Sequence, residues 1–353
     1  MKKQPDMEIL SKNFGDSSAK LFTLANADGY ELTVTNLGAA ITGFLVPARD
    51  GARVDAVLGY GSCEGYLRDT AYLGATVGRC ANRIAGASFS LNGKNYECDK
   101  NHCDKHTLHG GRDSWSKRVW DTVDAESREN AVTFALHSRD GDQGMPGNMR
   151  VSVTYALTDD NGIGICYRAV SDRDTIFNPT NHAYFNLEGH DAGDITEHRL
   201  QIDADAFTPI DAEGIPTGEI RAVKGTAFDF TTMKPIGRDI ANDEEQLRLG
   251  NGFDHNFVLN KHSENRPVAT VMSEKTGISM SLFTDMPGIQ FYSGNGLGGE
   301  PQKGGAPLVA RGAFCLETQF FPDSIHNAHF PSSVLKAGQV FNSRTEYRFS
   351  IAD

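Results

Sequence analysis

Two neighbouring stretches, RVSVTYA at residues 150–156 and GICYRAV at residues 164–170, alternate apolar and polar residues. Successive side chains of an extended strand point to opposite faces, so this period of two predicts strands with one buried face. The same alternation, or a run of β-branched and aromatic residues, recurs in further segments: residues 31–34, 131–137, 278–283, 290–292 and 346–351. Strands therefore dominate the predicted secondary structure.

One tight turn is also readable. Asn92-Gly93 lies between ASFSL (87–91) and KNYE (94–97), and this dipeptide is favoured in two-residue hairpins because both central residues need positive φ. Helical periodicity is confined to residues 62–68 and 238–249. Parallel strands would need helical crossovers, so the scarcity of helices predicts an all-β protein with antiparallel sheets stacked as a large β-sandwich.

The sequence shows no sign of a domain boundary. The 353 residues contain no Pro/Ser-rich linker, no low-complexity run and no obvious repeat. We interpret residues 1–353 as one domain, with residues 1–20 as a peripheral N-terminal segment. Length alone also allows two domains, because a typical domain has about 100–200 residues.

The chain is acidic, with 34 Lys and Arg against 46 Asp and Glu and a net charge of −12. This charge repels nucleic-acid phosphates and anionic membrane surfaces. No secretory leader or membrane-spanning apolar run is visible, and the six scattered cysteines do not suggest a disulfide framework. We therefore expect a soluble, cytoplasmic monomer or homodimer that acts on a small molecule and binds neither nucleic acid nor membranes.

The first candidate site segment is GRCANRIAG, residues 78–86. Asn82 and Arg83 lie at a tight turn there, and the planar fork of an arginine suits vicinal hydroxyls or a carboxylate. Taken alone, Arg83 also fits a surface ion pair. His109, in LHGG at residues 108–111, is a second candidate, although a lone histidine is usually structural or exposed.

Four further side chains before His109 superficially resemble zinc ligands: Cys98, His102, Cys103 and His106. Their spacing differs from the usual C-x2-4-C and H-x3-5-H pairs, and no second pair follows. We therefore predict no zinc site there.

The third segment, FNPTNHAYFNL at residues 177–187, surrounds His182 with amides, hydroxyls and aromatic rings. Such surroundings fix the tautomer of an imidazole and limit solvent, and they also fit a buried core histidine. Asp254 and Gln290 likewise lie beside aromatic residues. Aromatic faces with planar polar groups suit a sugar, which has an apolar face and a rim of hydroxyls.

The last segment, FCLETQFFPD at residues 314–323, places Glu317 in an apolar and aromatic strand pattern. An unpaired charge is costly there, so we expect this carboxylate to be paired or functional. Strict alternation also allows it to point to solvent. The glycine-rich run at residues 294–299 precedes no helical pattern, and we interpret it as a turn.

Together these motifs resemble the aldose 1-epimerase (galactose mutarotase) family. The resemblance runs from about residue 35 to residue 349 and departs from the family pattern at residues 98–106, where an Asn/Gly-rich stretch is more usual. The motifs that carry it, in order, are GRCANRIAG (78–86), LHGG (108–111), NHAYFNL (181–187), FDH (253–255) and LETQFFPD (316–323).

The resemblance implies a β-supersandwich enzyme that interconverts the α and β anomers of free aldohexoses such as galactose and glucose, with no cofactor and no metal. It also implies that His182 is the general acid and Glu317 the general base. The residues that it places around the sugar are Asn82, Arg83, His109 near the ring oxygen, Asp254 and, less distinctively, Gln290.

The chemistry of these residues agrees with that activity. Opening a pyranose needs a base for the proton of the anomeric hydroxyl and an acid for the ring oxygen. Nearby carboxylates favour a protonated His182, whereas burial opposes it. Three alternatives stay open: a hexose-6-phosphate 1-epimerase, a glycoside hydrolase that uses Glu317 with Asp254, and a non-catalytic carbohydrate-binding protein.

Overall fold

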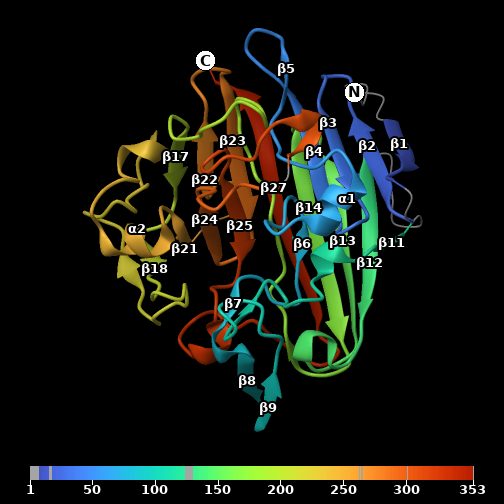
Figure 1. Cartoon of the computed structure of the whole chain (residues 1–353), viewed down its shortest axis with the longest axis vertical. Helices are drawn as coiled ribbons and strands as arrows, with labels where there is room; N and C mark the ends of the chain where they lie inside the picture. Colours follow the sequence, from blue (N-terminus) through green and yellow to red (C-terminus); the bar gives the residue numbers. More distant parts are fainter. Residues whose placement is uncertain are drawn as a thin grey trace.

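The computed structural model describes residues 8–15, 18–123, 130–261, 263, 265–299 and 301–352. In this part of the chain, long strands form a layered sandwich and the helices are short (Figure 1). The three large sheets are antiparallel throughout. The prediction of an antiparallel all-β sandwich is confirmed.

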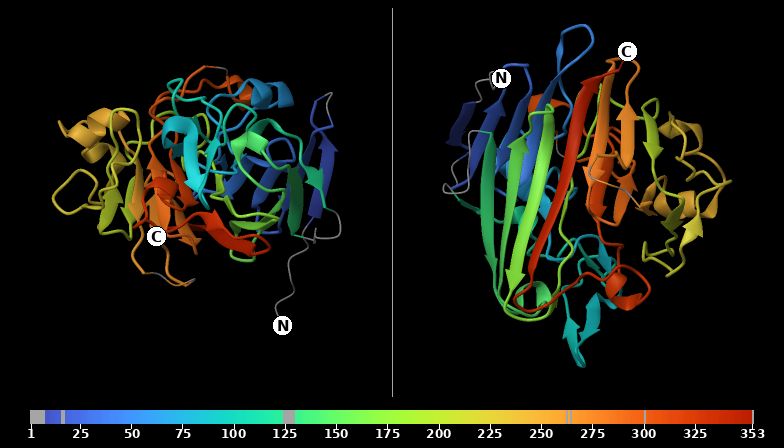
Figure 2. Two further views of the ribbon diagram at one scale, coloured as in Figure 1. Left: turned by 90° about the horizontal axis from the view of Figure 1, so that it is seen from below. Right: turned by 180° about the vertical axis from the view of Figure 1, so that it is seen from behind.

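A nine-stranded sheet occupies the centre of the molecule when it is seen from behind (Figure 2, right). Every predicted strand between residues 131 and 170, and those at 278–283 and 346–351, lies within it. Its strands in spatial order are β11 (Asp121–Thr122), β12 (Ala131–Ser138), β13 (Met149–Leu157), β14 (Gly162–Ser171), β27 (Val340–Ile351), β23 (Ile278–Thr284), β22 (Ala269–Met272), β17 (Arg199–Ile202) and β20 (Lys234–Pro235).

Two five-stranded sheets pack against one face of this sheet. The first contains β1 (Glu8–Asn13), β2 (Lys20–Ala25), β3 (Glu31–Thr35), β4 (Ala40–Pro47) and β5 (Arg53–Asp55). The second contains β19 (Arg221–Ala222), β18 (Ala206–Thr208), β21 (Asp254–Val258), β24 (Gly288–Tyr292) and β25 (Cys315–Gln319). Of the predicted peripheral segment 1–20, residues 8–13 form the edge strand β1, while residues 1–7, 16 and 17 lie outside the described residues.

The remaining elements are short. Four two-stranded pairs join β6 (Thr76–Val77) to β16 (Thr180–Asn181), β7 (Arg83–Ile84) to β10 (Thr107–Leu108), β8 (Ser88–Leu91) to β9 (Lys94–Glu97), and β15 (Thr175–Ile176) to β26 (Val334–Leu335). The α-helices are α1 (Cys63–Arg68) and α2 (Glu245–Gly250). The 3-10 turns are Ala85–Ala87, Trp115–Lys117, Asp142–Gly144, Ile236–Arg238, Lys303–Gly305 and Ser324–His326.

The predicted hairpin and one predicted helix are confirmed. Asn92 and Gly93 join β8 to β9, with φ of 52° and 75°. The helix predicted over residues 238–249 is wrong in its first half, because only Glu245–Gly250 is α-helical. Upstream, the amide of Asn242 donates to the carbonyl of Asp239, and acidic and amide residues of this kind favour turns over helix interiors.

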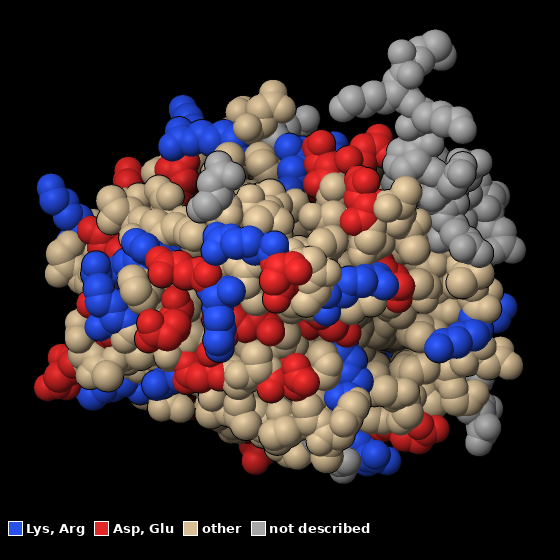
Figure 3. Space-filling view, turned by 90° about the horizontal axis from the view of Figure 1, so that it is seen from above, with Lys and Arg blue, Asp and Glu red and all other residues tan. Residues whose placement is uncertain are grey.

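The main core lies between the nine-stranded sheet and the two smaller sheets. Aromatic rings meet across the layers, with centroids 5.5 Å apart for Phe22 and Phe134 and 4.8 Å apart for Phe44 and Phe349. On the outside, Lys and Arg side chains alternate with Asp and Glu over the face shown in Figure 3. No helix among the described residues is long and apolar enough to cross a membrane.

Gly74 ties the first sheet to the short strand β16. Its amide donates to the carbonyl of His182 at 3.0 Å, and its carbonyl accepts from the amide of Ile41 at 2.9 Å. The backbone has φ of +67°, and a Cβ at this position would lie 1.9 Å from the carbonyl oxygen of Ile41. Only glycine fits both the left-handed conformation and this close approach.

We expect Gly74→Ala to lower the free energy of unfolding by about 3 kcal/mol or more, since it adds a backbone clash to a strained φ. The matched control is Gly51→Ala, where φ is +83° and no atom lies within 4 Å of the added Cβ. That variant should lose only about 1 kcal/mol, from the left-handed conformation alone. Urea unfolding followed by circular dichroism measures both, and equal losses in the two variants would contradict this account of Gly74.

Candidate active site

A polar cavity of about 200 Å³ lies beside strands of the second five-stranded sheet. Most of the candidate residues predicted from the sequence meet there, although they come from segments more than 200 residues apart in the chain. The cavity is lined by Thr70, Ala71, Tyr72, Asn82, Arg83, Leu108, His109, His182, Tyr184, Asp254, Tyr292, Gly296, Gly298 and Glu317.

Strand β25 fixes Glu317 at the bottom of this cavity. The neighbouring Thr318 faces the opposite way, where its hydroxyl lies 2.6 Å from that of Thr345 on β27. Because both faces of β25 are covered, Glu317 is only 2 % exposed. The reading in which alternation points Glu317 to solvent is therefore wrong, since this strand has no solvent face.

The buried carboxyl of Glu317 has few polar partners to offset the loss of contact with water. Its Oε2 atom is buried and has no hydrogen-bond partner among the described residues. Burial raises the pKa of Glu317 well above its ordinary value, the charge of Asp254 adds to this, and Arg83 partly opposes it. A carboxyl in this environment retains its proton at a pH where an exposed one has lost it.

His182 follows β16 and faces Glu317. Nε2 of His182 lies 3.6 Å from Oε1 of Glu317, and Nδ1 lies 3.5 Å from Sγ of Cys315. The imidazole stacks on the ring of Tyr184, with centroids 4.9 Å apart. Its backbone is fixed on both sides, because its amide donates to Ala75 at 2.9 Å and its carbonyl accepts from Gly74 at 3.0 Å.

Burial controls the protonation of this pair. Of the two effects weighed from the sequence, nearby carboxylates and burial, burial dominates and lowers the pKa of His182 to about 4. The neutral pair, with a protonated Glu317 and a neutral imidazole, is therefore favoured. It carries the same number of protons as a carboxylate with an imidazolium, so the movement of one proton interconverts the two forms.

His109 and Asn82 approach from a second direction. Both residues have a left-handed backbone, with φ of 48° and 57°. The amide of His109 donates to the carbonyl of Asn82 at 2.9 Å, and the amide of Asn82 donates to Nδ1 of His109 at 3.2 Å. Since Nδ1 accepts this bond, the proton of the neutral ring lies on Nε2, and His109 can act as a donor.

Asp254 links the remaining predicted contacts. Its Oδ1 accepts from the amide of Gln290 at 2.7 Å, and its Oδ2 lies 3.9 Å from Nη2 of Arg83. Arg83 lines the cavity with a side chain that is 15 % exposed, so it is not a surface arginine. Gln290 is buried behind Asp254 and does not line the cavity itself.

The possible metal ligands upstream of His109 do not converge. Cys103 is exposed, while His106 is buried and its Nδ1 accepts from the amide of Gly86 at 3.0 Å. Among the described residues, the cluster with ligand-like spacing is His109, His182 and Glu317. His109 offers this cluster no lone pair, because Nδ1 is taken by Asn82 and Nε2 bears the proton.

Several lining residues were not predicted. Tyr72 has φ of 59°, and its ring lies 4.7 Å from that of His109, but nothing in the local sequence distinguishes it from other tyrosines. Tyr184 and Tyr292 belong to segments already selected for their aromatic character. The run at residues 294–299 is a turn, as predicted, and it also contributes Gly296 and Gly298 to the cavity.

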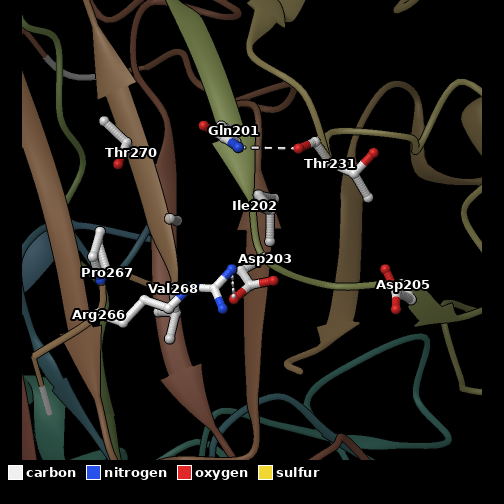
Figure 4. Close-up of a pocket in the computed structure, with 10 residues that line it drawn as sticks. Gln201, Ile202, Asp203, Asp205, Thr231, Arg266, Pro267, Val268 and Thr270 are labelled. Carbon is white, nitrogen blue, oxygen red and sulfur yellow. Dashed lines mark hydrogen bonds and ion pairs between the residues drawn. The ribbon is translucent and has the colours of Figure 1, made fainter. Parts of the chain in front are cut away.

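A second pocket, of about 260 Å³, lies beside β17 and β22 (Figure 4). Of its charged side chains Asp203, Asp205 and Arg266, the first and last point toward each other at 3.1 Å, and Gln201 donates to the carbonyl of Thr231. No histidine lines it. Acid–base chemistry therefore favours the cavity at Glu317.

We expect Glu317→Gln to raise the free energy of unfolding by about 1–3 kcal/mol at neutral pH, because the amide removes a buried, poorly compensated carboxyl. The unfolded-state carboxyl ionises above its ordinary pKa while the folded one stays protonated, so the native protein loses stability as pH rises. The gain in the variant should therefore grow with pH above about 4.5 and vanish below it.

Denaturant unfolding at several pH values measures this gain. Glu274→Gln, at an exposed glutamate paired with Arg199, is the control and should change stability by less than about 0.5 kcal/mol. A Glu317→Gln variant that is less stable than the native protein would show that the carboxyl is compensated after all.

Comparisons with known proteins identify the family of the chain. The family model described as Aldose 1-epimerase matches residues 20–348. The chain is 40% identical to the aldose 1-epimerase of Escherichia coli (strain K12) over 94% of its length and 95% of that protein. It is also 40% identical to the galactose mutarotase of Bos taurus, over 96% of each chain.

Solved structures give the same result. A GalM/aldose epimerase homologue from C. elegans superposes with a TM-score of 0.87 at 30% identity, covering 98% of this chain and 100% of that one. The galactose 1-epimerase of Lactobacillus acidophilus superposes with a TM-score of 0.85 at 28% identity, covering 99% and 100%. With this sequence match along nearly its whole length, the chain belongs to the aldose 1-epimerase family.

Proposed function

We propose that the protein is a mutarotase that interconverts the α and β anomers of free aldohexoses such as galactose and glucose. Glu317 is the general base and His182 the general acid. The observation that carries this proposal is the 3.6 Å approach of His182 Nε2 to Glu317 Oε1, two buried side chains that line a cavity of about 200 Å³.

Ring opening begins from the charged form of the pair. The carboxylate of Glu317 takes the proton of the anomeric hydroxyl, the C1–O1 bond becomes a carbonyl, and the bond from C1 to the ring oxygen breaks. The imidazolium of His182 delivers its Nε2 proton to the ring oxygen as that bond breaks. Sγ of Cys315, 3.5 Å from Nδ1, is placed to accept the second N–H of the imidazolium.

Ring closure reverses the proton movements. After the aldehyde group has rotated about the C1–C2 bond, the former ring hydroxyl returns its proton to His182 and attacks the other face of the carbonyl. The carbonyl oxygen regains a proton from Glu317. The pair ends with the protons it had at the start, so no cofactor is consumed.

The short distance between acid and base suits this reaction. The anomeric and ring oxygens are bonded to the same carbon, so the two groups that serve them must also lie close together. Inverting and retaining glycosidases instead use two carboxyls about 5 to 9.5 Å apart. The pairing of a carboxyl with an imidazole at 3.6 Å therefore favours mutarotation over glycoside hydrolysis.

The remaining predicted residues bind the sugar. Arg83 and Asn82 supply donors and acceptors for hydroxyls, and Nε2 of His109 donates toward the ring. Asp254 accepts from hydroxyls while Gln290 holds it in place from behind. Arg83 is the one lysine or arginine among the lining residues and already faces Asp254, so the cavity favours free aldoses over phosphosugars.

We also propose that the protein works in the reducing cytoplasm as a monomer or homodimer. The six cysteines are all free thiols, in accordance with a reducing compartment.

We expect Glu317→Gln and His182→Asn each to lower kcat for galactose about 10²- to 10⁴-fold, because each removes one proton transfer. Polarimetry on freshly dissolved α-D-galactose measures the rate. His137→Asn, at an exposed histidine on β12, should keep the native rate. Near-native rates in both site variants would contradict the assignment, and faster turnover of glucose 6-phosphate than of glucose would favour the phosphosugar alternative.

The pH dependence of kcat should reflect a pair that shares one proton. Burial lowers the pKa of His182 to about 4 and raises that of Glu317, so the singly protonated pair persists over a broad range around neutral pH. We expect kcat at saturating galactose, corrected for spontaneous mutarotation, to stay flat through pH 6.5 and to fall below about pH 4, where the pair takes up a second proton. A fall centred near pH 6.5 would indicate an ordinary, solvated histidine.

A further inference from the structure

The segment at residues 98–106, where the chain departs from the family pattern, packs behind Arg83. Nε of Arg83 donates to Nε2 of His102 at 3.3 Å. His102 itself does not line the cavity, so it reaches the site only through this arginine. Nη1 of Arg83 donates to Oδ1 of Asn82 at 3.3 Å, and Nη2 faces Asp254. The guanidinium therefore has a partner for each of its three nitrogens.

A turn from a distant part of the sequence confines the same guanidinium. Gly214 lies in the turn at residues 211–215, with φ of +76°. A Cβ on Gly214 would lie 2.9 Å from both Cζ and Nε of Arg83. The planar group thus lies directly against a glycine, and any larger residue would displace it.

This turn and the 98–106 segment are tied to each other. Oε2 of Glu213 lies 2.5 Å from Nζ of Lys105 and 3.2 Å from Nε2 of His106. His106 in turn accepts from the amide of Gly86, three residues after Arg83. The two segments therefore form one support that encloses the arginine from outside the cavity.

We propose that His102 and Gly214 are positioning residues that hold Arg83 toward the sugar and thereby set the affinity of this protein for aldoses. This inference rests on the proposed function, because it assumes that Arg83 binds sugar hydroxyls. Arginine is effective in such contacts only when its fork is fixed in the right plane.

The contact is also sensitive to pH. Nε2 of His102 lies 3.3 Å from Nε of Arg83 and 3.2 Å from the carbonyl oxygen of Glu213. A neutral Nε2 accepts from Arg83, whereas a protonated one donates to Glu213 and repels the guanidinium. Burial lowers the pKa of His102, and the charges of Arg83 and His106 lower it too, while the hydrogen bond to the carbonyl of Glu213 and the charge of Asp254 oppose this shift. The neutral, accepting form therefore prevails at neutral pH.

The test compares His102→Leu, which has no acceptor, with His102→Gln, whose amide oxygen accepts but does not titrate. We expect His102→Leu and Gly214→Ala each to raise KM for galactose about tenfold, as for the loss of one hydrogen bond to a charged group, with kcat changed less than about threefold. His102→Gln should keep KM within about twofold of the native value. The native KM should rise at acidic pH, and that of His102→Gln should not.

A control variant and a binding measurement complete the test. Gly225→Ala, where φ is +81° and no atom lies within 4 Å of the added Cβ, should leave KM unchanged. Calorimetry of galactose binding should show the same tenfold weakening without relying on turnover. Native KM in both His102→Leu and Gly214→Ala, or a joint loss of kcat and thermal stability, would overturn the inference. A native protein that does not accelerate mutarotation at all would instead refute the proposed function.

Discussion

The proposed activity depends on the burial of one carboxyl group. Glu317 lies on a strand that is covered on both faces, and Oε2 has no hydrogen-bond partner among the described residues. Removing a carboxylate from water costs several kcal/mol unless the charge is paired, and a group in this situation retains its proton instead. His182, 3.6 Å away and equally buried, is the group that can accept that proton. The burial of Glu317 costs free energy of folding, but it also leaves Glu317 and His182 as a pair that shares one mobile proton.

Several residues around the cavity have a strained backbone conformation. Tyr72, Asn82 and His109 all line the cavity with a positive φ, and Gly74 beside His182 shares this conformation. Non-glycine residues in the left-handed region are strained, and such strain persists where the rest of the fold imposes it. The strand that carries Glu317 is tied to the nine-stranded sheet, because the hydroxyl of Tyr347 on β27 donates to the carbonyl of Leu316 on β25 at 2.7 Å.

Much of the fold was predictable because its signals are local. Alternation along residues 150–156 and 164–170 and the Asn92-Gly93 turn depend only on neighbouring residues, and the structure confirms them. The helix predicted over residues 238–249 failed where local periodicity competes with turn-forming side chains. Pairing among distant strands, such as β14 with β27, carries no comparable local signal.

The site was predictable to the extent that each motif contributes its own polar residue. The cavity gathers Asn82, His109, His182 and Glu317 from four separate motifs. The arrangement of these residues around one cavity could not be predicted, because they lie far apart in the sequence. GRCANRIAG also contains Arg79, which is fully buried and donates to backbone carbonyls, so composition alone does not distinguish a structural arginine from one that lines the site.

The residues that hold the site residues in position make contacts that no sequence motif predicts. The packing of Gly214 against the Arg83 guanidinium arises only in the folded chain. The same holds for the protonation of the proposed catalytic pair, because the extent to which His182 is buried, and hence its lowered pKa, is known only from the folded structure.

The proton on Glu317 is the most direct test of this account. Infrared difference spectra between the native protein and Glu317→Gln, recorded at pH 7 without sugar, distinguish a protonated carboxyl from a carboxylate. The account predicts that the native protein shows the carbonyl band of a protonated carboxyl that the variant lacks, since burial raises the pKa of Glu317 well above its ordinary value. A difference spectrum with only carboxylate bands would contradict the shared-proton pair.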